Sequence, residues 1–421
     1  MITLHCARWV LPIDRPAIPH GAVAIDGRMI AWVGSFAKRP RAYRALPVEQ
    51  VIDHGHAALM PGFVNAHSHV LLHEARGLMD GVGFWEWLGG AIVTLDLKDP
   101  SANREACLAG FREGLAAGIT CWGDNHFRLE PFQAAMELGI KATCFLEIFG
   151  IRGDVDRQRD ELLAKLAQAR AESNGDVVAG ISPHAPYTVP PPLLELAGRL
   201  SRDEGYLLST HLAETKEEVE FLRSPRGPVR KLMGRHSRTL IPPTDLPGTR
   251  YLKRHGCLTD RTLVVHGVHL TPPELRDLAR SGATLVHCPV SNSRLRCGIA
   301  PIEEAAATGV RLALGTDSAA SGERHDPFLA MGLALHLQQS LHPSGVLDAV
   351  RLLQAATLDG ARALHRDREL GSLTAGKRAD LVALALLEPR RLSRRTVEEE
   401  IVYGAERSWV RGVWVDGVRR V

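Results

Sequence analysis

Short apolar segments alternate with amphipathic, helix-like segments along the middle of the chain. Eight of the apolar segments have the length and composition of buried strands, and they span residues 59–69, 118–125, 141–150, 177–187, 206–214, 262–270, 283–292 and 311–320. Helical patterns lie between them, among others at 104–118, 159–173 and 272–282. Strands that alternate with helices indicate a parallel sheet, and eight repeats favour a (β/α)8 barrel of the TIM type. A doubly wound open sheet is the alternative, but no G-x-G-x-x-G motif follows the first strand.

The pattern at both ends of the chain consists of short strands and turns instead. Residues 1–58 and 366–421 carry short apolar runs separated by Asp-Gly and glycine turn signals. We therefore predict that both ends build one composite β-sandwich domain beside a catalytic barrel of residues 59–365. The segment 221–252 is rich in Pro, Gly and Arg and lengthens the connection after the fifth strand. A plain surface insertion, a lid and a dimer contact are its alternatives.

Composition narrows the class of protein but not its chemistry. The 421 residues are 45% hydrophobic and 24% charged, as in ordinary soluble proteins, and the net charge of +3 does not indicate a nucleic-acid or membrane partner. The seven cysteines include no C-x-x-C pair, which fits a reducing compartment. No signal peptide and no apolar run of about 18 residues is apparent. We expect a cytoplasmic protein with a small-molecule substrate, and a homodimer is one option for its assembly.

Most of the predicted strands end in residues that can bind a metal or carry a proton. They are His67, His69, Asp124, Glu147, His184, His211, Glu214, His266, His287, Asn292 and Asp317. The carboxyl ends of barrel strands meet on one face, so these side chains are expected to converge there. His67 and His69 are two residues apart on a strand and therefore point to the same side. Chance proximity is the alternative for this pair alone.

Additional ligands favour a metal site. His211 offers a third nitrogen and Asp317 a carboxylate. A catalytic zinc ion usually has three or four protein ligands and a water, whose pKa it lowers from about 15.7 towards about 7. Glu214 follows His211 by three residues and can carry a proton between that water and the substrate; a carboxylate at a helix entry is its alternative role. His266 can orient or deprotonate the same water, and Asp317 can assist.

Several motifs resemble those of a known superfamily when they are taken in chain order. VNAHSH, PHAPYTV, HLAE, VVHGVHL, HCPVSN, LGTDSAASG and GSLTAGKRADLV are similar to the motifs of the amidohydrolase superfamily, and of its cytosine-deaminase-like and adenosylhomocysteine-deaminase-like aminohydrolases. The resemblance covers essentially the whole chain. It implies a (β/α)8 barrel with a small β-sandwich formed by both termini.

The resemblance also implies a set of site residues. One divalent metal, usually zinc, would be held at the positions of His67, His69, His211 and Asp317, although Fe2+ and Mn2+ suit these ligands too. Further positions that match are the proton shuttle Glu214, the catalytic histidine His266 and the substrate contact His184. The fourth strand, VVAGISPH, has no lysine to bridge two metals, and the H-x-E with P-C-x-x-C signature of other zinc deaminases is missing. Hydrolytic deamination, C–NH2 to C=O with release of ammonia, is the reaction predicted.

The loops resemble those of deaminases that act on adenine nucleosides with large 5′ substituents. Within that group, LTPPELRDLARSG, HCPVSNSRLRCGIAP and the long insertion before RYL are similar to aminodeoxyfutalosine deaminases of menaquinone biosynthesis. Trp85 is expected to stack on the base, or else to be buried with its helix. Arg294, Arg296 and Arg324 are candidates to pair with a substrate carboxylate, with solvated surface arginine as the alternative for each. Asn292 and Ser318 complete the predicted substrate-binding set.

Alternatives remain open at this stage. One is deamination of adenosylhomocysteine, methylthioadenosine, a free base or a triazine ring. Hydrolysis of another C–N bond or of a C–Cl bond on the same scaffold is a second, and a non-catalytic metal-binding relative is a third. The second strand, GITCWGDNH, departs from the family pattern, and His126 at its end is either a site residue or a cap. His73 and Glu74 extend the histidine cluster but are predicted to be loop residues, not ligands.

Overall fold

The barrel predicted from the sequence is present. The computed structural model describes residues 2–47, 50–96, 99–150, 154–224, 226–233, 241–387 and 395–421. Eight parallel strands follow one another around the barrel in chain order: β6 (Phe63–Ser68), β7 (Ile119–His126), β8 (Lys141–Ile148), β9 (Val177–Pro183), β10 (Leu208–Leu212), β11 (Thr262–His266), β12 (Thr284–His287) and β13 (Arg311–Leu314). The ring closes where the backbone N–H groups of Thr316 and Asp317 donate to the His67 carbonyl, both at 3.1 Å.

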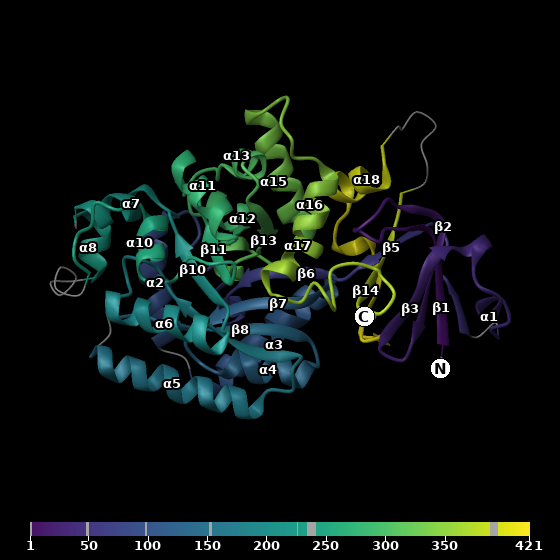
Figure 1. Ribbon diagram of the computed structural model, residues 1–421, viewed down its shortest axis with the longest axis horizontal. Helices are drawn as coiled ribbons and strands as arrows, with labels where there is room; N and C mark the ends of the chain where they lie inside the picture. The colour runs from purple at the N-terminus through teal and green to yellow at the C-terminus, as the bar shows by residue number, and fades with distance from the viewer. Residues whose placement is uncertain are drawn as a thin grey trace.

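Helices surround the barrel strands (Figure 1). After the first strands come η3 (Val70–Ala75), α2 (Phe84–Asp96), α3 (Pro100–Ala116), α4 (Glu130–Leu138), α5 (Val155–Glu172), α6 (Pro191–Glu204), α7 (Lys216–Arg223), α8 (Gly227–Met233) and α10 (Gly248–Arg254). The later ones are α11 (Pro272–Ser281), α12 (Pro289–Arg294), α13 (Ile302–Ala307), α14 (Ala319–Gly322), α15 (Pro327–Leu341), α16 (Ala349–Ala355), α17 (Leu358–Ala363) and α18 (Val397–Gly404). Within the described ranges, no helix is long and apolar enough to span a bilayer.

The three helical patterns read from the sequence coincide with α3, α5 and α11. Local caps explain where two of them begin. The Asp154 side chain accepts a hydrogen bond from the N–H of Asp156 at the start of α5. Thr271 and Glu274 form a capping box at the start of α11, and Gly282 ends that helix in the left-handed conformation.

Both termini contribute to a second sheet, as predicted. Its strands pair in the order β16-β15-β14-β5-β1-β2-β3, with β4 on β1. They are β1 (Ile2–Val10), β2 (Ile18–Asp26), β3 (Met29–Ser35), β4 (Val51–Asp53), β5 (Ala57–Pro61), β14 (Leu381–Ala385), β15 (Val410–Val415) and β16 (Val418–Arg419); the short elements η1 (Phe36–Lys38), α1 (Arg41–Arg44) and η4 (Arg407–Trp409) accompany them. Antiparallel pairing of β14 with β5 joins the two ends of the chain, and both termini lie in this sheet at the right of Figure 1.

One predicted strand boundary is wrong. The segment 59–69 was expected to be the first barrel strand, but residues 59–61 belong to β5 of the terminal sheet, and the barrel strand β6 begins at Phe63. The chain changes sheets at Gly62, where a Cβ atom would overlap the side chain of Thr120. The apolar run continues through this change because both strands are buried, so hydropathy alone does not reveal it.

A buried ion network joins the two sheets. Nζ of Lys141, at the start of β8, donates to Oδ1 of Asp380 and to Oδ1 of Asp416, each at 2.8 Å, and the lysine is only 1% exposed. Arg378 also pairs with Asp416 and, at 3.1 Å, with Asp176. These ion pairs lie at the amino-terminal end of the barrel strand, and so they contribute to stability on the face where barrel enzymes do not place their catalytic residues.

The segment 221–252 is partly described. Residues 225 and 234–240 lie outside the described ranges. Phe221, Val229 and Ile241 pack with Ala185 and Tyr187 into one small apolar cluster, and Trp85 packs against it. The described part of the segment therefore covers the barrel wall beside Trp85, and its role stays a prediction.

Candidate metal and catalytic site

Two of the predicted metal ligands lie side by side at the end of β6. The imidazole centroids of His67 and His69 are 4.8 Å apart. His67 is completely buried, whereas 13% of the His69 side chain is exposed. The i, i+2 spacing thus places both rings on the same side of the chain, as the sequence indicated.

His211 joins this pair from β10. Its Nε2 lies 3.4 Å from Nε2 of His69. Its Nδ1 donates to the carbonyl oxygen of His184 at 2.8 Å, and because a carbonyl only accepts, this contact places the proton on Nδ1. The Nε2 lone pair is then directed at the histidine cluster, which is the usual arrangement of a metal-binding histidine.

Asp317 completes the donor set from the turn after β13. Its Oδ1 lies 3.8 Å from Nε2 of both His67 and His69. The other oxygen, Oδ2, accepts hydrogen bonds from the hydroxyls of Ser291 at 2.5 Å and Ser321 at 2.8 Å. Asp317 has a φ of 56°, a strained conformation for a residue with a side chain. Burial raises the pKa of this carboxyl, but the three neighbouring histidines and Ser291 outweigh burial and lower it, so Asp317 is ionised.

The donors fit a divalent metal. Among the described residues neither ring nitrogen of His67 has a hydrogen-bond partner, although both atoms are buried. An unpaired buried nitrogen is costly, and such an atom at the centre of a cluster points to a ligand. Three imidazoles and one carboxylate are a common zinc donor set. Burial also lowers the pKa of His67 well below its usual value, which favours the neutral imidazole with one nitrogen lone pair for a metal.

Glu214 and His266 lie together beside these donors. Oε1 of Glu214 is 3.4 Å from Nε2 of His266. Oδ1 of Asn292 accepts a hydrogen bond from Nδ1 of His266 at 2.9 Å, so Nε2 is the ring nitrogen that faces the carboxyl group. Burial, together with the charges of Asp317 and Glu218, raises the pKa of Glu214 well above its usual value. The raised pKa makes the Glu214 carboxylate a stronger base, so it can accept a proton and pass it on.

Glu218 was missed by the sequence analysis. Its carboxylate accepts hydrogen bonds from the backbone N–H groups of Ala213 at 2.7 Å and Glu214 at 2.9 Å. Thr215 caps the helix that carries Glu218 by accepting from its N–H at 3.2 Å. The T-x-x-E spacing from Thr215 to Glu218 is a capping signature and was available in the sequence, but it indicates a helix start and not a contact to the site.

The predicted substrate contacts His184 and Trp85 lie next to the donors or in the wall beside them. The ring of His184 lies 4.7 Å from that of His211, and its Nδ1 is 2.9 Å from the hydroxyl of Thr188. Trp85 packs edge-on against Tyr187 at 5.5 Å, and its buried Nε1 has no partner in the described part of the chain.

Asn292 and Ser318 are engaged within the site itself. Asn292 is bound to His266, while its Nδ2 is buried and unpaired among the described residues. The hydroxyl of Ser318 contacts that of Ser321 at 2.8 Å, and the backbone N–H of Ser318 donates to Oδ1 of Asp317. Asn292 therefore retains a donor for a substrate, whereas Ser318 supports Asp317 and the start of α14.

The candidate arginines have partners of their own. The guanidinium of Arg294 pairs with Asp80 at 2.5 Å and with Glu323 at 2.6 Å. Arg296 donates to the carbonyl of Gly81 at 2.8 Å. Arg324 is 3.6 Å from Asp326 and half exposed. The contacts of Arg294 with Asp80 and of Arg296 with Gly81 hold this segment against the chain that follows β12. A role in binding substrate stays a prediction for each of the three arginines.

Further polar residues from the strand ends lie at the same mouth. Oδ1 of Asp124 accepts from the hydroxyl of Ser68 at 2.8 Å and from the N–H of Val70 at 2.9 Å, which holds the chain around His69. Nδ1 of His126 accepts from the N–H of Arg128 at 3.0 Å. A carboxyl oxygen of Glu147 lies within 4.8 Å of ring nitrogens of His69 and His211. Asp124 and Glu147 therefore belong to the convergence predicted from the strand ends, and His126 accepts a hydrogen bond from the chain that follows it.

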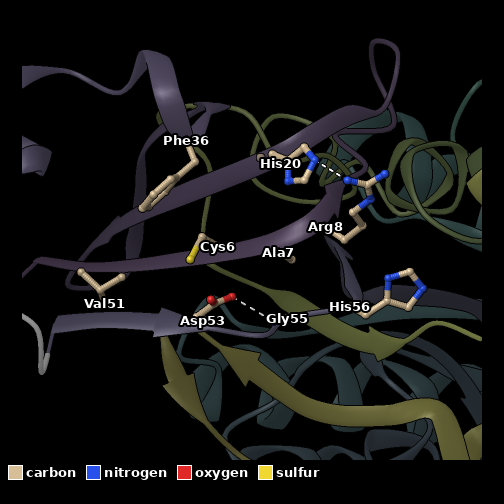
Figure 2. A pocket seen from close by; sticks show the side chains of 10 residues that line it. Cys6, Ala7, Arg8, His20, Phe36, Val51, Asp53, Gly55 and His56 are labelled. Atoms are coloured by element: carbon tan, nitrogen blue, oxygen red, sulfur yellow. Dashed lines mark hydrogen bonds between the residues drawn. The ribbon is translucent and has the colours of Figure 1, made fainter. Parts of the chain in front are cut away.

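A separate pocket of about 430 Å³ lies in the terminal sheet, and Figure 2 shows the side chains that line it. It is lined by Cys6, Ala7, Arg8, His20, Gly21, Phe36, Val51, Asp53, Gly55 and His56. Its polar groups bond to one another: Arg8 donates to His20, and Oδ1 of Asp53 accepts from the N–H of Gly55 at 2.8 Å. None of the predicted catalytic residues lines it, so the site is assigned to the barrel.

Comparison with known proteins identifies the family of the chain. The model of the amidohydrolase family matches residues 58–420. A 5-methylthioadenosine/S-adenosylhomocysteine deaminase from Moorella thermoacetica is 30% identical over 415 residues, which are 97% of this chain and 91% of the relative. The zinc-bound crystal structure of an adenosine deaminase from Xanthomonas campestris superposes with a TM-score of 0.86 at 28% identity, covering 99% of this chain and 92% of that one. The aminofutalosine deaminase of Helicobacter pylori shares the fold, with a TM-score of 0.80 at 21% identity over the whole of both chains.

Proposed function

Because the chain belongs to the amidohydrolase family and is a hydrolase of C–N bonds, we propose that it deaminates the adenine ring of a nucleoside whose 5′ position carries a substituent. Methylthioadenosine and adenosylhomocysteine are the leading candidate substrates. Relatives named 5-methylthioadenosine/S-adenosylhomocysteine deaminases are about as long as this chain and align along nearly all of it. Aminodeoxyfutalosine, predicted from the loops, is the second candidate.

One contact carries the proposal. Glu214 and His266 are both buried and lie 3.4 Å apart, next to three histidines and an aspartate that fit a metal. A buried carboxyl group with a raised pKa beside such donors is the arrangement that proton transfer to a ring nitrogen requires.

His67, His69, His211 and Asp317 are proposed to hold one divalent metal, with zinc as the preferred ion. When bound, the metal lowers the pKa of water and so supplies a nucleophile at neutral pH. The protein contributes the orientation of these donors: the carbonyl of His184 fixes the tautomer of His211, and two serine hydroxyls hold Asp317.

The side chains of the site supply the proton transfers. Glu214 takes one proton of the attacking water and delivers it to the ring nitrogen beside the reacting carbon, while the water oxygen bonds to that carbon. The second proton of the water passes to the exocyclic amino group. The C–N bond then breaks, ammonia departs, and the carbon retains the water oxygen as a C=O group. His266, whose Nε2 faces Glu214, orients the carboxyl group during both transfers and is held in place by Asn292.

Ammonia release by the zinc-loaded protein tests this function. The substrates to compare are methylthioadenosine, adenosylhomocysteine, aminodeoxyfutalosine, adenosine, guanine and cytosine. We expect the highest kcat/KM for a nucleoside with a 5′ substituent, and no ammonia from the Glu214→Gln variant. A clear preference for aminodeoxyfutalosine would assign the protein to menaquinone biosynthesis. Turnover of free bases alone, or of none of the panel, would contradict the proposal.

A further inference from the structure

A second group of metal-binding side chains lies outside the site described above. His73 is in η3, Glu113 is in α3, and His325 lies between α14 and α15. One ligand atom from each of the three lies within 4.8 Å of the other two. Nδ1 of His73 is 3.9 Å from Oε2 of Glu113, and the rings of His73 and His325 are stacked with centroids 6.1 Å apart. This group shares no residue with the first donor set.

The environment of His325 leaves one of its ring nitrogens available as a ligand. The amide of Asn65 accepts from the N–H of Thr316 at 3.0 Å, so its Nδ2 is the atom that donates to the Thr316 hydroxyl at 2.7 Å. That hydroxyl has the carbonyl of Asp317 at 3.4 Å as an acceptor for its own proton. With the proton directed there, the hydroxyl oxygen can accept from Nδ1 of His325, which lies 2.9 Å away.

The Thr316 hydroxyl can thus bond the Nδ1–H tautomer of His325, in which Nε2 has the lone pair. His325 is 1% exposed, and across the described residues its Nε2 has no hydrogen-bond partner. The edge of the ring packs against Trp122 at 5.4 Å, so the imidazole is held in one orientation. A buried, oriented and unpaired nitrogen next to a carboxylate is the second observation, besides the cluster itself, that points to a cation.

Glu113 is held as an anion. Its Oε1 accepts from Arg76 at 2.8 Å, and its Oε2 accepts from the backbone N–H of His325 at 3.1 Å. Burial raises the pKa of this carboxyl, but these two donors outweigh burial and lower it. Arg76 bonds to Oε1, and Oε2 accepts only the one hydrogen bond from His325, so Oε2 keeps a lone pair for a ligand bond.

We propose that His73, Glu113 and His325 form a second divalent-cation site, with zinc as the ion that their chemistry favours. Two imidazoles and one carboxylate with an open fourth position are a known zinc arrangement. The donors of a tetrahedral zinc ion lie about 3.4 Å apart for bonds of about 2.1 Å, so the His73 side chain, which is 17% exposed, must rotate inward when the ion binds.

The position of this second site indicates a structural role. Its ligands join η3, which directly follows His69, to the segment that follows Asp317. An ion bound there would cross-link the two segments that carry ligands of the first site, with α3 as the third anchor. Because such an ion would bind the folded chain and not the unfolded chain, it would raise the thermal stability of the protein. The sequence analysis predicted that His73 is a loop residue and not a ligand; the proposal replaces that prediction.

Zinc content distinguishes the two sites. The protein is incubated with excess zinc and desalted, and the metal is counted by elemental analysis. We expect two zinc ions per chain in the wild type and one in the variant His73→Ala/His325→Leu. His211→Ala should lose the other ion and keep this one. His255→Ala is the matched control, because His255 also pairs with a glutamate, Glu195, at 3.2 Å, and it should bind as much zinc as the wild type.

A second variant and a second measurement keep the test decisive. Glu113→Gln preserves side-chain volume and both histidines, so it serves if the double variant fails to fold, and it should also bind one ion fewer. Zinc should raise the melting temperature of His211→Ala but not that of His211→Ala/Glu113→Gln. The proposal is overturned if the double variant and Glu113→Gln retain the zinc content of the wild type. If His211→Ala keeps both ions while Glu113→Gln binds one ion fewer, the proposed active site is contradicted and this second site stands.

Discussion

Glu218 accepts a hydrogen bond from the backbone N–H of Glu214 at 2.9 Å, and its other oxygen accepts from Ala213 at 2.7 Å. Ala213 has a φ of 52°, a conformation that a residue with a Cβ seldom adopts. The buried carboxylate of Glu218 thus holds a strained turn, and this turn presents Glu214 to the site. Glu218 is a positioning residue, since its contacts are to the backbone and not to the donor set.

We expect Glu218→Gln to lower kcat by about tenfold to a hundredfold, because small displacements of a catalytic group have effects of that size. An amide can accept only one of the two hydrogen bonds, and its NH2 would oppose the other N–H. KM should change little. Glu220→Gln, an exposed position on the same helix, is the control. An unchanged kcat, or a change confined to KM, would contradict the positioning role.

Glu214→Gln should retain the metal and lose turnover. General acid–base groups contribute about 10² to 10⁴ in rate, and a neutral amide cannot transfer the proton. Ammonia release and zinc content, measured on the same preparation, check this prediction. Turnover close to that of the wild type would show that another residue carries the proton.

His211→Ala should remove the metal of the first site. The histidine contributes an Nε2 that lies 3.4 Å from that of His69, and its loss leaves three donors. Metal content and activity should fall together, while far-UV circular dichroism stays unchanged. Zinc binding with unaltered stoichiometry would rule out the ligand role of His211.

Arg294→Ala tests how a carboxylated substrate is recognised. The sequence predicted Arg294 as a partner for a substrate carboxylate, but its guanidinium already pairs with Asp80 and Glu323. We therefore expect KM to change by the same factor for adenosine and for aminodeoxyfutalosine. Steady-state kinetics on both substrates decide the matter, and a selective rise for aminodeoxyfutalosine would support the role predicted from the sequence.

The ion network between the two sheets should contribute to the acid stability of the fold. Burial raises the pKa of Asp416, but hydrogen bonds from Arg378 and Lys141 outweigh burial and lower it to about 2 from the ordinary 3.8. A depressed carboxyl pKa stabilises the fold above the ordinary pKa, and this stability is lost as the pH falls from 3.8 through about 2.

Asp416→Asn removes this contribution and therefore lowers the free energy of unfolding relative to the wild type. The difference between the two proteins should be largest at about pH 5 to 7 and shrink as the pH falls below about 4. Urea denaturation at several pH values measures the deficit. Asp160→Asn, an exposed position in α5, serves as the control. A deficit that does not depend on pH would show that Asp416 contributes by packing alone.

The sequence by itself determined the barrel and the main donor set. Eight apolar segments separated by helical patterns specify the strands, because burial on both faces requires continuous apolar runs. The polar residues that end them, such as His67, His69, His211 and Asp317, meet at one face in any parallel barrel. Pattern and topology are sufficient for these residues, since His67 and His69 lie at the end of β6, His211 lies near the end of β10 and Asp317 lies in the turn after β13.

Only the tertiary structure decided the remaining relationships. Residues 59–61 pair with β14, and no local pattern indicates which of two sheets a buried strand joins. Glu218 reaches a backbone turn through side-chain geometry that a helix-capping pattern does not specify. His73, Glu113 and His325 come from three elements, with 212 positions between the last two. Their contact depends on how η3, α3 and the turn after β13 pack against one another, and neither hydrophobic periodicity nor motif spacing encodes such packing.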